Sequence, residues 1–136
     1  MEILVFPKHH KGILSPKLTL SEFDCKCSNL TCTRTLVLSR TVRSFNLTRS
    51  AYKAPIKVNS AFRCQVHNED VGGVENSYHK VGAAIDILPL GDFTVDEFNR
   101  LEELARLYFD VVLRYEGFLH CHNKSDDGIT SKLQEH

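Results

Sequence analysis

The sequence predicts a single α+β domain in which a small antiparallel sheet is flanked by helices. The chain has 136 residues, of which 42% are hydrophobic and 25% charged, enough to bury one ordinary soluble core. Short apolar or alternating segments typical of strands occur at 56–60, 83–88, 109–113 and 118–122. Helical spacing of apolar residues occurs near 35–51 and 94–108. This mixture of short strands and two amphipathic helices is the basis for the fold class.

The N-terminal residues 1–17 are basic and contain prolines and a glycine. We expect them to form either a flexible arm or an edge strand ahead of a domain that spans 18–123. Within that domain, Thr19 or Ser21 is suited to cap one helical turn that inserts Phe23 into the core.

The first long helix is expected near 35–51. Leu38, Val42 and Phe45 follow one another at helical spacing with arginines between them, which predicts one buried face. Pro55 then prevents the helix from continuing.

Turn signals separate the later elements. A short helix over 66–71 is closed by a pair of glycines. The helix over 94–108 begins with a capping box formed by Thr94 and Glu97. The polar tail 124–136 is expected to fray.

Composition excludes several classes of partner. The net charge is zero, so nothing indicates a nucleic-acid partner, and no apolar run is long enough to span a bilayer. The first residues lack the basic and apolar regions of a signal peptide, so we expect synthesis in a cytoplasm without one.

The cysteines leave two interpretations open. Their number is five, so at least one thiol is unpaired. Cys25, Cys27 and Cys32 cluster in sequence, but a metal clip needs a fourth ligand. We favour reduced, partly buried structural cysteines.

A histidine and a carboxylate suggest a metal site. Asp86 lies inside an apolar run, where a carboxylate is costly to bury unless a positive group pairs with it. A metal ion shared with His79 is one such partner; a surface histidine and a turn aspartate are the alternative. Residues His120 and His122 alternate along a strand and face the same side, so either one can supply a third ligand. Three such ligands and an open position make a hydrolytic zinc site.

A longer motif surrounds this pair. It reads Ser60-Ala-Phe-Arg63, His67-Asn68, Val71-Gly-Gly73 and Asn76-Ser77-Tyr-His79-Lys-Val-Gly82-Ala-Ala-Ile-Asp86-Ile. The motif resembles that of the zinc D-Ala-D-Ala carboxypeptidase-like peptidases, which act on bacterial cell-wall peptides and share their zinc site with hedgehog signalling domains. The Ser-Glu-Phe23-x-Cys-Lys-Cys27 opening and the 109–120 segment are similar to phage and bacterial members.

The resemblance implies a role for each matching residue. It makes His79 and Asp86 zinc ligands, together with His120, which follows an aromatic and an aliphatic residue as in phage-type members. The alternative, from members that end in His-x-His, makes His122 the ligand and His120 its assistant. With His120 as ligand, His122 is expected to steady the oxyanion of the reaction.

Three further residues are candidates for the substrate site. The resemblance assigns Arg63 to a substrate carboxylate or carbonyl and places Ser77 near the substrate. Glu116 is the candidate general base, although its spacing from the zinc histidine matches the family poorly.

The resemblance implies a zinc metallopeptidase with one zinc ion per chain. Its substrate would be peptidoglycan stem peptides or cross-links, cut as a D,D-carboxypeptidase or endopeptidase. We expect a monomer that acts on the cell wall after release, like an endolysin, or within a virion. The alternative is a non-catalytic zinc-binding domain of hedgehog type or a virion structural protein.

Overall fold

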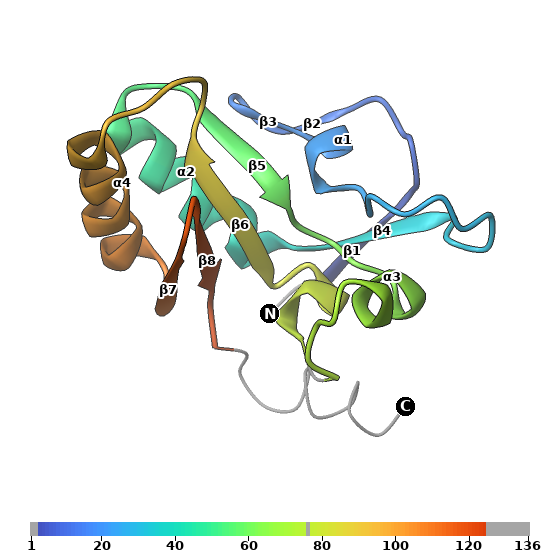
Figure 1. Cartoon of the computed structure of the whole chain (residues 1–136). Coiled ribbons are helices and arrows are strands. Elements are labelled where there is room, and N and C mark those ends of the chain that lie inside the picture. Colours follow the sequence, from blue (N-terminus) through green and yellow to red (C-terminus); the bar gives the residue numbers. More distant parts are fainter. Residues whose placement is uncertain (1–2, 76, 125–136) are drawn as a thin grey trace.

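The computed structural model describes residues 3–75 and 77–124 (Figure 1). All but the first residue of the predicted polar tail lies outside these residues. The elements of the described part are, in chain order, β1 (Ile3–Pro7), β2 (Ile13–Ser15), β3 (Leu18–Thr19), α1 (Leu20–Phe23), β4 (Arg34–Leu38), α2 (Ser39–Tyr52), β5 (Ile56–Ser60), α3 (Gln65–Asp70), the 3-10 turn η1 (Tyr78–Val81), β6 (Ala84–Pro89), α4 (Val95–Tyr108), β7 (Val111–Tyr115) and β8 (Phe118–His122). The predicted α+β class is confirmed.

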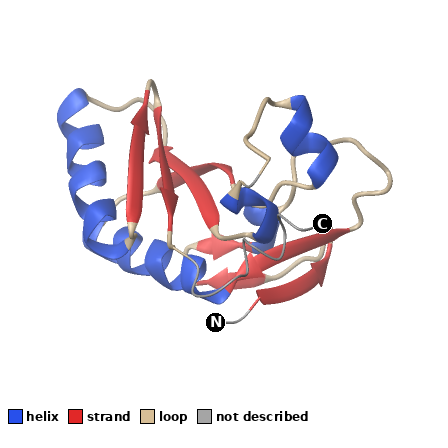
Figure 2. Cartoon of the chain, turned by 90° about the horizontal axis from the view of Figure 1, so that it is seen from below, coloured by secondary structure: helices blue, strands red, loops and turns tan. Residues whose placement is uncertain are grey.

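The main sheet has the strand order β5-β6-β8-β7, and every neighbouring pair is antiparallel. Ile85 and Ile87 of β6 and Leu119 and Cys121 of β8 are fully buried in the core. Because side chains alternate along a strand, Asp86 lies on the opposite face of the sheet. The two long helices, α2 and α4, lie together on one side of the sheet, and α1, α3 and η1 lie on the other (Figures 1 and 2).

Helix α4 begins as the sequence predicts. The backbone N–H of Glu97 donates to the hydroxyl of Thr94, and the Glu97 carboxylate accepts from the Thr94 backbone. Its buried face carries Phe98, Leu101 and Ala105. No helix in the described part of the chain is both long and apolar enough to cross a membrane.

The helix expected near 35–51 starts later than the sequence predicts. Residues Arg34–Leu38 form strand β4, and helix α2 begins only at Ser39. The apolar residues at the end of β4 pair with β1, so that Leu38 lies opposite Ile3. Of the two expectations for the N-terminus, the edge strand is therefore the one observed for Ile3–Pro7.

Candidate metal centre

Three elements bring His79, Asp86 and His120 together. The register of the main sheet places Asp86 of β6 directly opposite His120 of β8. His79 is fully buried in η1, which packs beside these strands. Its Nε2 atom and the Nδ1 atom of His120 each lie 3.1 Å from Oδ1 of Asp86.

Local sequence fixes the turn that carries His79. The hydroxyl of Ser77 accepts a hydrogen bond from the backbone N–H of His79, which caps the turn. Gly82 ends the turn with a φ of 70°, in the left-handed region that favours glycine. A Cβ atom at Gly82 would lie 2.1 Å from the carbonyl oxygen of Leu36, so no other residue fits between η1 and β4.

The hydrogen bond from Nδ1 of His79 to the Ala61 carbonyl determines which tautomer the ring adopts. Nδ1 lies 2.6 Å from the carbonyl oxygen of Ala61, which can only accept, so Nδ1 carries the hydrogen. Nε2 then faces Oδ1 of Asp86 with a lone pair. Two acceptors at 3.1 Å need a proton or a cation between them. Burial lowers the pKa of His79 despite the opposing effect of Asp86, so a cation is the better fit.

The distances from Asp86 to the two histidine nitrogens also fit zinc. Zinc binds histidine nitrogen and carboxylate oxygen at ~2.0–2.2 Å, so ligand atoms of a tetrahedral site lie roughly 3.3–3.5 Å apart. The observed separations of 3.1 Å are close to that edge length. A backbone carbonyl that holds the non-coordinating nitrogen of a histidine is also typical of metal sites.

Asp86 is ionised in this environment. Burial acts to raise its pKa, but the adjacent imidazole rings of His120 and His79 outweigh burial and lower the pKa to about 2. The carboxylate is therefore a ligand-ready anion over the physiological pH range.

His122 contacts His120 on the side of the ring away from Asp86. Its Nδ1 is 2.8 Å from Nε2 of His120, and its ring stacks on Tyr78 with 4.1 Å between ring centroids. Among the described residues, His79, Asp86 and His120 form a metal-ligand cluster that does not include His122. Burial, together with the nearby charges of His120 and His79, lowers the pKa of His122 to about 4. The geometry favours His120 over His122 as the third ligand.

Arg63 lies beside this cluster and lines a cavity with Asp86 and His120. Its backbone N–H donates to the carbonyl of His79 at 3.0 Å. Its Nε is buried and has no hydrogen-bond partner among the described residues. Burial lowers the pKa of Arg63, and the charge of Asp86 acts in the opposite direction. A half-buried guanidinium whose Nε has no partner among the described residues is suited to an incoming acceptor group.

A cavity of about 430 Å³ joins Arg63 to Asp86 and His120. The Gly72–Gly73 turn forms part of its wall. A Cβ atom on Gly73 would lie 3.0 Å from Nη1 of Arg63 and closer still to the Asn68 amide, so the glycine leaves room for both side chains. A second cavity shares Arg63 and His120 with the first and is also lined by Ser77, His79 and His122.

The structure does not bring Glu116 into the site. Glu116 is exposed in the turn between β7 and β8, and it lines neither of the two cavities at the cluster. The side chains of Tyr115 and Phe118 on either side of that turn stack on each other and line the cavity instead. Sequence reasoning did not assign a role to these two aromatics or to His67, which also lines this cavity.

A model of the Peptidase M15 family matches residues 16–122. The chain belongs to the M15 peptidase family. This is the zinc D-Ala-D-Ala carboxypeptidase and hedgehog-type family, and the match covers all three residues of the cluster. No curated protein and no solved structure matches the chain. Membership supports a peptidase and agrees with the candidate metal-binding groups of the structure.

Proposed function

We propose that this M15 family member is a zinc-dependent peptidase of bacterial peptidoglycan, acting on stem peptides or cross-links as a D,D-carboxypeptidase or endopeptidase. The observation that carries the substrate class is Arg63, which lines the same cavity as Asp86 and His120 and whose Nε has no hydrogen-bond partner among the described residues. Peptidoglycan stem peptides offer free carboxylates near their scissile bonds, and a forked guanidinium binds carboxylates in two places.

His79, Asp86 and His120 would hold the zinc ion, as their donor atoms and spacing allow. When bound, zinc supplies a Lewis acid that polarises a carbonyl and makes water a stronger nucleophile. The Ala61 carbonyl fixes the ring of His79, and His122 fixes the ring of His120 through its Nδ1. This leaves Nε2 of His122 as the atom that can donate to the oxyanion.

The remaining side chains of the cavity position the substrate. Arg63 orients the peptide by its carboxylate or carbonyl, and Ser77 lines the second cavity while it caps η1. The stacked rings of Tyr115 and Phe118 provide an apolar wall that limits water beside the scissile bond. Action on the wall after release, or from within a virion, is part of the same proposal.

The test is digestion of purified peptidoglycan by zinc-loaded protein, followed by mass analysis of the fragments. The expected result is loss of terminal D-alanine or separation of cross-linked stems, abolished by a chelator and in Asp86→Ala. Arg63→Lys should raise KM far more than it lowers kcat, because lysine cannot make a bidentate contact. Arg43→Lys, an exposed change on α2, is the matched control. Intact peptidoglycan after digestion by the zinc-loaded wild type would refute the proposal.

One observation favours a non-catalytic alternative. The expected base, Glu116, is exposed and does not line the cavities at the cluster. A zinc-binding domain of hedgehog type, or a virion structural protein, needs no base. This alternative predicts that zinc-loaded protein binds peptidoglycan fragments in a calorimetric titration and leaves every peptide bond intact.

A further inference from the structure

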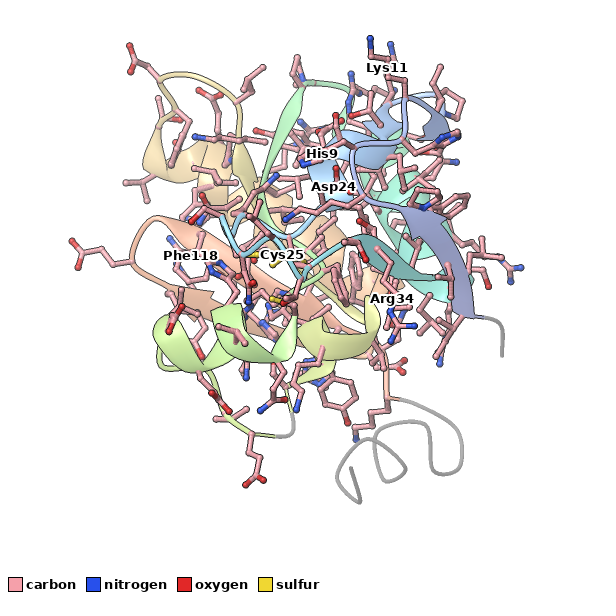
Figure 3. All side chains as sticks on the ribbon, turned by 90° about the vertical axis from the view of Figure 1, so that its right-hand side faces the viewer. His9, Lys11, Asp24, Cys25, Arg34 and Phe118 are labelled. Atoms are coloured by element: carbon pink, nitrogen blue, oxygen red, sulfur yellow. The ribbon has the colours of Figure 1, made fainter. Side chains whose placement is uncertain are left out.

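A second group of metal-ligand side chains lies near Arg63, which lines a further cavity together with Cys32 and Cys64. Cys25, Cys27 and Cys32 come from the loop after α1, and Cys64 comes from the segment between β5 and α3. The four Sγ atoms all lie within 4.8 Å of one another. Figure 3 shows sulfur atoms gathered beside the labelled Cys25. The sequence offered three of these thiols, and the fold supplies the missing fourth.

The distances between the sulfurs match a tetrahedral thiolate site. Zinc binds thiolate sulfur at ~2.3 Å, so two sulfurs of a tetrahedral site lie about 3.8 Å apart. The Sγ of Cys64 lies 3.7 Å from those of both Cys25 and Cys27. A disulfide would place two sulfurs about 2.05 Å apart. The cysteines are free in the structure, and one sulfur at nearly equal distance from two others is not a disulfide arrangement.

Hydrogen-bond donors face three of the four thiols, Cys25, Cys27 and Cys64. The backbone N–H of Cys64 points at the Sγ of Cys25, and that of His67 at the Sγ of Cys64, each at 3.4 Å. The ammonium of Lys8 lies 3.5 Å from the Sγ of Cys27 and 3.3 Å from its carbonyl oxygen. Four thiolates around a divalent cation carry a net negative charge, which N–H donors and a lysine offset.

We propose that Cys25, Cys27, Cys32 and Cys64 bind a second, structural zinc ion, distinct from the ion at the His79 cluster. A closed four-thiolate set leaves no open position for substrate, so this ion is structural. It joins the 25–32 loop to the segment that precedes α3. That segment includes Arg63, whose neighbour Phe62 also donates its backbone N–H to the carbonyl of Phe23. The ion thereby holds the segment from which Arg63 enters the cavity.

The first test uses the wild-type full chain, purified under reducing conditions without a chelator. Elemental analysis should find about two zinc ions per chain. An organomercurial thiol reagent should release about half of this zinc. The cobalt-substituted protein should show the near-ultraviolet sulfur-to-cobalt charge-transfer absorption of tetrahedral thiolate coordination, and His79→Ala should keep that absorption.

Variants assign the ion to the cluster. Cys27→Ser and Cys32→Ser should each lower the zinc content to about one ion per chain and abolish the charge-transfer absorption. Cys121→Ala, a buried cysteine outside the cluster, is the matched control and should keep about two ions. Because serine variants can fail to fold, the wild-type cobalt spectrum stands as an independent test.

Three results would overturn the inference. They are a wild-type chain with a single zinc ion that His79→Ala removes, a cobalt protein without sulfur charge transfer, and an intact mass that shows disulfide formation in place of bound metal. Loss of peptidoglycan hydrolysis alone would not, since the readouts are metal content and thiolate absorption. The thiolate site and the proposed activity can therefore fail separately.

Discussion

Replacing His120 and His122 one at a time separates a metal ligand from the residue that supports it. In the structure, Nδ1 of His120 faces Asp86, while its Nε2 is 2.8 Å from Nδ1 of His122. His120→Ala removes one of three protein ligands and should lower the zinc content by about one ion per chain. His122→Ala removes only the outer partner of His120, and such losses weaken metal affinity by roughly 10–100-fold. At saturating zinc, His122→Ala should therefore match the zinc content of the wild type.

The assay is competition for zinc against a chromophoric chelator, with total zinc measured on the same samples. The exposed His10 supplies the control, and His10→Ala should match the wild type in both measurements. Peptide hydrolysis by His122→Ala should fall by ~10²–10³, the usual cost of one oxyanion donor. The reverse pattern, in which His122→Ala loses zinc and His120→Ala retains it, would show that the ligand assignment is wrong. Full zinc in both variants would refute the three-ligand site itself.

Three further predictions test the frame around the site. Gly82→Ala should lower the free energy of unfolding by more than Gly91→Ala does. Both positions have positive φ, which costs an alanine ~1–2 kcal/mol, but only Gly82 is crowded by backbone atoms. Urea unfolding of the two variants measures the difference, and equal stabilities would contradict the reasoning. In the apo protein, the free energy of unfolding should fall as the pH drops from about 6.5 towards 4. The pKa of His122 is lowered to about 4 in the folded protein, so over this range the unfolded chain binds a proton that the folded chain does not. Unfolding curves at several pH values check this, and His122→Ala should reduce the dependence of stability on pH. Arg63→Leu should weaken the binding of a free carboxylate ligand to the zinc-loaded protein and leave the zinc content unchanged. Calorimetry measures the first and elemental analysis the second. Undiminished carboxylate affinity would exclude Arg63 as the carboxylate-binding residue.

Secondary-structure elements that are determined by residues close together in the chain were predictable from the sequence. The capping box of Thr94 and Glu97 places the start of α4 because both partners lie within one helical turn. The start of α2 was predicted wrongly, because Leu36, Val37 and Leu38 suit either a helix or a strand. Their state depends on β1, which is distant in sequence and pairs with them in space. Periodicity alone cannot detect such a partner.

The same distinction separates the two groups of ligands. Alternation along β8 places His120 and His122 on one face of the strand. The apolar run of β6 marks Asp86 as a carboxylate that needs a partner. A short stretch of sequence is therefore enough to identify these candidates. Which histidine reaches Asp86 depends on the register of β6 against β8, which only the fold provides. The fourth thiol was missed for a similar reason, since Cys64 lies 37 residues from Cys27 and no spacing rule joins them.

Residues 61–64 connect the two sites. The carbonyl of Ala61 holds the ring of His79, the side chain of Arg63 lines the cavity, and the Sγ of Cys64 belongs to the thiol cluster. The backbone of Arg63 is also hydrogen-bonded to the carbonyl of His79. A shift of Cys64 therefore moves groups that fix both the ring of His79 and the guanidinium of Arg63. The geometry of the His79 cluster therefore depends on side chains that do not contact its ligand atoms. For this reason, the site formed by His79 and Asp86 requires the Cys25–Cys32 loop to be folded beside it.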